Sequence, residues 1–238
     1  MAIGITGVDS GSNATDATSY ANFTVSRTPG TNLLQILVVK SRVASGTPNA
    51  PTVTGCNLTW NLIGTANNNP PAANHSVNFY YAIGSSPSAG QLTTDFAGQT
   101  QTHIIWSWSE CTGINITTPV VSGSFTELGQ NHSSGVDPFI LTLPAFGSAS
   151  NAAFGAVAGF TTVNLAPASD FTEIHDIPFT DGASTNSFQS QWKINDTTID
   201  WNLDDANKNA IAGGFEIADV SFGGNAIRIS RMTLLGAG

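Results

Sequence analysis

Residues able to do acid–base or metal chemistry are few in this sequence, and their spacing does not gather them along the chain. The four histidines, His75, His103, His132 and His175, form no HxH, HxxxH or HExxH pattern. A metal or catalytic site built on them would have to be assembled entirely by the fold. We therefore expect no catalytic residue, no bound metal and no cofactor.

Hydrolase signatures are missing as well. A serine nucleophile of the G-x-S-x-G type needs a sharp strand-to-helix turn, and the chain has no such motif. A glycosidase needs two carboxylates opposed across a cleft, and the sequence alone pairs none of Glu110, Glu127, Glu173 and Glu216. Glu110 follows two tryptophans and precedes Cys111, and we interpret it as a residue that orients the following turn.

Two weaker patterns remain as candidate sites. The loop residues Asp204, Asp205 and Asn207 supply oxygen atoms of the kind that calcium prefers, but the loop lacks the glycine and terminal glutamate of an EF-hand. A solvated turn is the alternative. Trp192 and Trp201 alternate with polar residues, so one of them could be exposed as a platform for a glycan.

The two cysteines, Cys56 and Cys111, leave two alternatives open. They form one possible disulfide, or they stay reduced as small buried side chains. The other tryptophans, Trp60, Trp106 and Trp108, share their parity with apolar neighbours and are predicted to lie in the core.

Charge excludes several partners. The formal net charge is −9, only 10% of the residues are charged, and the chain has seven Lys and Arg residues. Nucleic acid and anionic membranes require clustered cations, so neither is expected as a partner. The longest apolar run, Leu33–Val39, is far shorter than the roughly 20 residues of a spanning helix. The N-terminus has no basic start or apolar core of a secretory signal, which predicts either folding in the cytoplasm or removal of a signal before residue 1, and the initiating Met favours the first.

The elements that would position these residues are strands, because apolar residues alternate with period two between frequent turn residues. The predicted strands are Tyr20–Ser26, Leu33–Val43, Thr52–Cys56, Leu58–Ala66, Val77–Ile83, Gln91–Phe96, His103–Cys111, Val120–Phe125, Phe139–Leu143, Ala152–Phe160, Phe171–Ile177, Ser187–Lys193, Thr197–Leu203, Ile211–Val220 and Ala226–Leu235. So many strands predict an all-β protein with two packed antiparallel sheets, a β-sandwich. No long helix and no internal repeat is expected.

The strand patterns also predict which faces are buried. Ile104, Trp106 and Trp108 share one parity and are expected to point into the core, while Ser107 and Ser109 point out. In the neighbouring segment the inward set is Val77, Phe79, Tyr81 and Ile83. Leu33–Val39 is apolar on both faces, as in a central strand that is covered on both sides.

One domain is expected, in which residues 23–238 form the sandwich and residues 1–22 form an N-terminal arm or a first strand. The arm would dock on another subunit. Domains of about 250 residues are common among all-β proteins, and no segment reads as a linker.

Several short motifs of strands and turns occur along the chain, namely Leu58–Trp60, Phe79–Gly84, Gly90–Phe96, Trp106–Gly113, Ile140–Phe146 and Asn151–Ala158. Together they resemble the jelly-roll-like β-sandwich domains of accessory virion proteins of tailed bacteriophages. The resemblance covers roughly residues 30–220 and speaks to fold more than to function. It implies a protein of the virion that is made in the host cytoplasm, self-associates and docks on other virion proteins such as a major capsid protein.

Three functional hypotheses follow. The first is a non-enzymatic structural protein of a phage particle, either a capsid decoration or a head or tail accessory protein. The second is a carbohydrate- or receptor-binding β-sandwich module, for which Trp192 and Trp201 are the candidate contacts. The third is a glycoside-acting hydrolase, which requires a facing pair of carboxylates.

Overall fold

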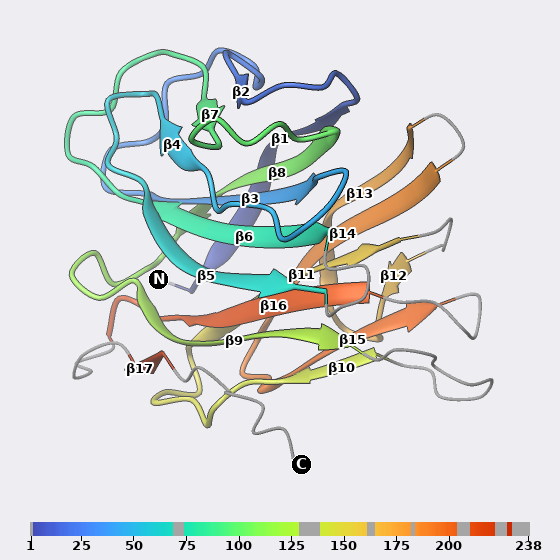
Figure 1. The fold of residues 1–238 in the computed structure, drawn as a ribbon. Coiled ribbons are helices and arrows are strands. Elements are labelled where there is room, and N and C mark those ends of the chain that lie inside the picture. Colours follow the sequence, from blue (N-terminus) through green and yellow to red (C-terminus); the bar gives the residue numbers. More distant parts are fainter. Residues whose placement is uncertain are drawn as a thin grey trace.

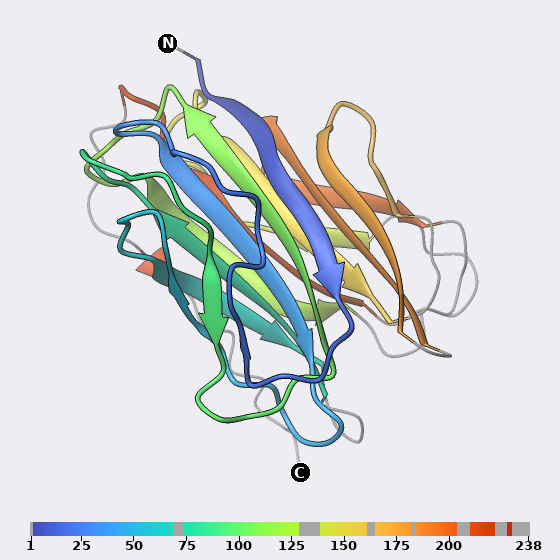
Figure 2. The same cartoon turned by 90° about the horizontal axis from the view of Figure 1, so that it is seen from above.

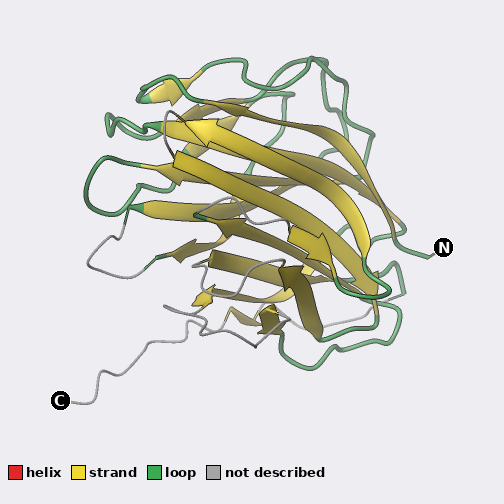
Figure 3. Cartoon of the chain, turned by 90° about the vertical axis from the view of Figure 1, so that its right-hand side faces the viewer, coloured by secondary structure: helices red, strands yellow, loops and turns green. Residues whose placement is uncertain are grey.

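The computed structural model describes residues 2–68, 74–128, 139–160, 165–181, 184–203, 210–221 and 228–229. Every regular element in these residues is a β-strand (Figure 3). The expectation of an all-β protein is confirmed for this part of the chain. Within the same residues there is no helix with the length and hydropathy needed to cross a membrane.

The N-terminal half of the chain forms one large and one small sheet. The first large sheet has the order β1 (Gly4–Asn13), β8 (His103–Thr112), β3 (Leu34–Arg42), β6 (His75–Ala82) and β5 (Asn61–Asn67). The first small sheet has the order β2 (Ser19–Tyr20), β7 (Thr93–Asp95) and β4 (Thr52–Thr54). All of these strand pairs are antiparallel.

The C-terminal half forms a second pair of sheets. The second large sheet has the order β13 (Thr172–Asp181), β14 (Ser184–Ile194), β11 (Ala152–Gly159), β16 (Ala210–Ile217), β9 (Val120–Leu128) and β17 (Arg228–Ile229). The second small sheet has the order β10 (Phe139–Thr142), β15 (Thr198–Leu203) and β12 (Leu165–Pro167). Only the short strand β17 pairs in parallel, with β9, among the described strands.

These sheets lie in four layers (Figures 1 and 2), whereas the sequence predicted two. The large sheets face each other across an apolar cluster that includes Ile36, Phe79 and Phe154. The first small sheet covers the outer face of the first large sheet, and the second small sheet covers the outer face of the second. The central strands β3, β11 and β16 are buried on both faces. One face of each strand lies against the other large sheet, and the opposite face lies beneath a small sheet.

The two halves of the chain have the same strand order. The first unit, which spans β1 to β8, has the orders 1-8-3-6-5 and 2-7-4. Subtracting eight from the strand numbers of the second unit, β9 to β16, gives the same two orders. In both units the pairings of the first and fifth strands carry a register shift typical of a β-bulge. The fold thus contains an internal repeat that the sequence analysis did not find.

The units pack against each other with a pseudo-twofold relation. The first strand of each unit lies against the fifth strand of the other, as β1 against β13 and β9 against β5. Such reciprocal pairing is the arrangement of an isologous dimer, here built within one chain. The N-terminal segment, considered above as an arm or a strand, supplies β1 as the edge strand beside β8.

The prediction of which side chains of β8 are buried is correct for one face of the strand and wrong for the other. Ile104, Trp106 and Trp108 lie in the core beneath the first small sheet, as predicted. Ser107 and Ser109 were expected to face solvent, but their exposed fractions are 1% and 0%. The prediction was wrong because the second large sheet covers this face, so polar side chains are enclosed there too.

Small residues let the layers approach closely in the second unit. A Cβ atom added at Gly213 would lie 2.5 Å from the ring of Phe79, and one at Gly214 would lie 2.4 Å from Ile199. The same composition characterises the predicted strand Ala152–Phe160. The structure makes most of this segment strand β11, with Ile199 and Trp201 of the second small sheet resting on its Gly155.

The burial of Trp201 provides a test of the outer layer of the second unit. Its exposed fraction is 0%, and its indole Nε1 donates to Oε1 of Gln189 at 2.7 Å. We expect Trp201→Ala to lower the free energy of unfolding by about 3–5 kcal/mol. The control Ile140→Ala, at a half-exposed position of the same sheet, should change it by less than about 1 kcal/mol. Urea denaturation measures both, and equal small effects would show that Trp201 is not in the core.

Candidate functional site

A cluster of ionisable and amide side chains is enclosed between the two large sheets. Lys40 on β3 extends across the interface, where its Nζ donates to Oδ1 of Asn186 on β14 at 2.8 Å. The same Nζ lies 2.5 Å from Nε2 of His103, at the start of β8. The exposed fractions of Lys40, His103 and Asn186 are 0%, 0% and 2%. This contact therefore joins one unit to the other away from solvent.

Aromatic rings and a second histidine surround this contact. His75, at the start of β6, stacks on Phe160 with ring centroids 4.3 Å apart. His103 lies against Phe179, with centroids 4.9 Å apart, and its centroid is 6.3 Å from that of His75. We call Lys40, His75, His103 and Asn186 the Lys40 cluster.

Electrostatics keep His75 neutral. Burial lowers its pKa to about 2, and the nearby positive charges of Lys40 and Arg42, together with His103, act in the same direction. An ammonium group has only protons to offer, so Nε2 of His103 is the acceptor in its contact with Lys40. His103 is thus neutral in this contact, with its own proton on Nδ1.

A second polar contact joins the large sheets nearer β1. Nδ1 of His175 on β13 lies 2.8 Å from Oγ of Ser107 on β8. Ser107 also lies 3.0 Å from Oγ of Ser190 on β14. Burial lowers the pKa of His175, and Asp9 opposes that shift. The serine–histidine pair resembles part of a catalytic triad, but with Ser107 enclosed between the sheets it serves as a bridge and offers no access to a substrate.

The histidines show where sequence reasoning fell short. They were expected to lie in separate settings, yet the fold brings His75 and His103 together around Lys40. The available signal was parity, because Lys40 follows Ile36 and Val38 on the same face of β3. His132 lies outside the described residues.

Glu110 holds a segment that precedes β3, and not the turn after β8 as predicted. Its Oε1 accepts from Nη2 of Arg27 at 2.8 Å. Its Oε2 accepts from the backbone N–H of Gly30 at 2.7 Å and from Nε2 of Gln35 at 2.8 Å. A carboxylate with three donors acts as a clamp on the loop that leads into β3.

Glu216 makes the corresponding clamp in the second unit. It is buried on β16, the strand equivalent to β8, and accepts from the backbone N–H of Gly147 at 3.1 Å in the loop before β11. Asn151 and Ser122 donate to the same carboxylate, at 2.5 and 3.0 Å. Glu110 and Glu216 are therefore each engaged within their own unit. Glu173 is exposed, and the side chain of Glu127 lies outside the description.

The cysteines lie on opposite faces of the first large sheet. Cys111 belongs to the cluster between the large sheets, whereas Cys56 lies beneath the first small sheet. Both are free, so the possible disulfide does not form. The intervening sheet separates the two thiols beyond the reach of a bridge.

The two tryptophans considered for glycan binding also lie against cores. Trp201 is fully buried between the second large and second small sheets, so it is not the exposed one of the pair. Trp192 is half-buried and packs on the cluster between the large sheets. The candidate loop Asp204, Asp205 and Asn207 lies outside the described residues. Elsewhere in the described chain no three His, Cys, Asp or Glu residues are grouped as metal ligands would be.

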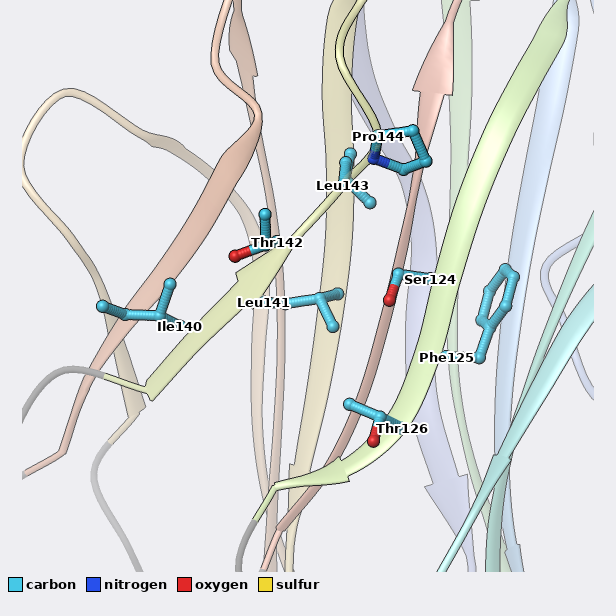
Figure 4. A pocket seen from close by; sticks show the side chains of 8 residues that line it. All are labelled: Ser124, Phe125, Thr126, Ile140, Leu141, Thr142, Leu143 and Pro144. Carbon is cyan, nitrogen blue, oxygen red and sulfur yellow. The ribbon is translucent and has the colours of Figure 1, made fainter. Parts of the chain in front are cut away.

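Open depressions are lined by side chains of a different kind. A groove of about 330 Å³ runs between β9 and β10 (Figure 4). It is lined by Ser124, Phe125, Thr126, Ile140, Leu141, Thr142, Leu143 and Pro144. A shallower depression of about 430 Å³ is lined by Thr31, Asn32, Leu33, Thr112, Gly113, Ile114 and Val220. Neither lining includes an ionisable side chain.

Comparison with protein-family models, with curated proteins and with solved structures finds no match for this chain.

The buried neutral histidine makes stability depend on pH. Because the folded pKa of His75 is about 2, below the unfolded value of about 6.5, its contribution is complete above about pH 6.5 and declines as the pH falls. The free energy of unfolding should therefore fall toward pH 5 by up to about 1.4 kcal/mol per unit for this group. His75→Phe should remove that part of the slope, as measured by urea unfolding at several pH values. An unchanged slope would contradict the burial of a neutral His75.

The carboxylate clamps supply a second prediction. Glu216→Gln removes the charge that three donors share, and we expect a loss of about 1–3 kcal/mol in the free energy of unfolding. The matched control is Glu173→Gln at an exposed position, with an expected change within about 0.5 kcal/mol. Thermal and urea denaturation compare the pair. Equal stabilities would mean that Glu216 does not hold the loop.

Proposed function

We propose that this chain is a non-enzymatic structural protein of a phage particle that works by self-association and by docking on other virion proteins. In this proposal each unit is jelly-roll-like, and the chain is a tandem pair of such units. Supporting it, each unit places strands 1, 8, 3 and 6 side by side in one sheet and strands 2, 7 and 4 in another. Eight-stranded jelly rolls are common in viral capsid proteins and lectins.

One observation carries the proposal: the Lys40 cluster is enclosed, while the two depressions described above are lined by apolar, hydroxyl and amide side chains. The Lys40 cluster and the His175–Ser107 pair lie between the large sheets. The groove between β9 and β10 is lined by no acid, base or thiol. Such a distribution favours action through surface contact over action through bound substrate.

The outer surface supports the same proposal. Large apolar side chains are exposed at scattered positions, namely Val25, Leu62, Ile116, Ile140, Ile194 and Val220. Few charges surround them, since charged residues make up 10% of the chain. Hydroxyl and amide groups cost less to desolvate than charges, so this surface suits burial against other subunits. A major capsid protein is the partner that the proposal names, and the location is the virion.

The carbohydrate-binding alternative receives no specific support from the tryptophans. Trp201 is inside the second unit, and Trp192 packs on the core between the large sheets. The hydrolase alternative needs a facing pair of carboxylates. Glu110 and Glu216 do not form such a pair, because Glu110 is bonded within the first unit and Glu216 within the second. We therefore keep the assembly role as the single proposed function.

Self-association is the property to measure first. Sedimentation velocity of the purified chain over a wide concentration range should show a discrete homo-oligomer with a fixed stoichiometry. Mass spectrometry of purified phage particles that encode this chain should detect it in stoichiometric amounts. A monomer at every concentration that is also missing from the particles would refute the proposal. Glycan binding on an array, or turnover in a glycosidase screen, by such a monomer would favour the corresponding alternative.

A further inference from the structure

The geometry of the Lys40 cluster points to a covalent modification site: we propose that Nζ of Lys40 displaces ammonia from the side-chain amide of Asn186, leaving an isopeptide bond between the two units. His103 is the proton carrier of the reaction. This inference goes beyond the proposed function and does not depend on it.

The reacting groups already lie within contact distance. Nζ of Lys40 is 2.8 Å from Oδ1 of Asn186, and the carbonyl carbon lies about 1.23 Å behind that oxygen. The amine is therefore within about 4 Å of the atom that it would attack, close to the separation of about 3–3.5 Å in a near-attack arrangement. Because both residues project from strands of two packed sheets, they are held together permanently. Effective molarities of about 10⁵ M or more make even an unreactive amide a possible electrophile.

The surroundings favour a nucleophilic amine. A lysine attacks only when it is neutral, and burial away from water disfavours the ammonium form of such a group. Burial and nearby positive charges lower the pKa of the neighbouring His75 to about 2, so this enclosure disfavours a further cation. Nε2 of His103 lies on Nζ itself and is placed to take its proton.

The leaving group is also free to depart. Nδ2 of Asn186 is buried and has no hydrogen-bond partner among the described residues. A buried amide nitrogen without a partner is costly in a folded protein and calls for an explanation. Loss of this nitrogen as ammonia would remove the unsatisfied donor, which gives the reaction a driving force within the fold.

The steps balance without any oxidant or cofactor. Nζ first passes one proton to Nε2 of His103, and its lone pair then attacks the Cγ atom of Asn186 while the carbonyl electron pair moves to Oδ1. The resulting imidazolium protonates Nδ2, the bond between Cγ and Nδ2 breaks as the carbonyl re-forms, and ammonia leaves. Nζ loses a further proton to the neutral imidazole, which passes it to the departing ammonia. The products are one amide bond and one ammonium ion.

The bond would join the two units at the level of their large sheets. Lys40 and Asn186 are 146 positions apart in the sequence, so the link would close a loop that contains most of the strands. Separation of the large sheets would then require breaking a covalent bond. A cross-link that closes a long loop also restricts the unfolded chain, which raises resistance to heat.

Intact-mass measurement of the denatured full-length protein tests the proposal. We expect the protein to be lighter than its sequence by one ammonia. After trypsin digestion, one branched peptide should contain both Lys40 and Asn186, and fragmentation should locate the bond between their side chains. A succinimide formed at an asparagine would show the same loss of ammonia. Hydroxylamine distinguishes the two products, because it cleaves the chain at a succinimide and leaves an isopeptide bond intact.

Three variants assign the chemistry. Lys40→Arg and Asn186→Ala should each restore the full mass expected from their sequences, whereas the control Lys193→Arg, at a partly exposed ion pair with Asp196, should keep the loss of ammonia. His103→Gln should accumulate the unlinked form, with a slower appearance of the lighter species over time. A wild-type protein of full sequence mass, with an unlinked Lys40 peptide even after prolonged incubation, would overturn the proposal.

Discussion

The structure depends on the burial of both faces of each large sheet. A strand in this position cannot turn its polar side chains to water, so a polar group there is stabilised only by a partner inside the protein. Much of the polar chemistry between the sheets follows from this constraint. Lys40 reaches Asn186, Ser107 bridges His175 and Ser190, and these contacts link one unit to the other. Where the sheets are purely apolar, small residues such as Gly213 admit the aromatic rings of the facing layer.

The repeated unit explains why one chain of this size has four sheets. Each unit is a large sheet with a small sheet on its outer face, and its inner face would be exposed if it were alone. Packing the two inner faces together buries both, as in a symmetric dimer. The clamps of Glu110 and Glu216 occupy corresponding places, each holding the loop that leads into the central strand of its unit. These corresponding carboxylate contacts support an origin of the two units by duplication of one unit, although no repeat is visible in the amino-acid sequence.

Much of the strand pattern could be predicted because alternation is a local property. Leu33–Val39 reads as a covered central strand, and β3 has that character. Strand β1 was harder, since the Gly- and Ser-rich Gly4–Asn13 lies at an edge and buries little. The outward assignment of Ser107 failed because alternation alone cannot reveal a second covering layer. The Lys40 cluster could not be foreseen, because its members come from β3, β6, β8 and β14 and meet only when two distant sheets pack.

The central claim is that the inner faces of the two large sheets meet, and a designed disulfide between them tests it most directly. The Oγ atoms of Ser107 and Ser190 are 3.0 Å apart, close enough for sulfur atoms at the same positions to bond. The double variant Ser107→Cys with Ser190→Cys should, after oxidative refolding, give a disulfide-linked pair of peptides from β8 and β14 on non-reducing peptide mapping. A folded double variant in which both new thiols stay free would contradict the face-to-face arrangement.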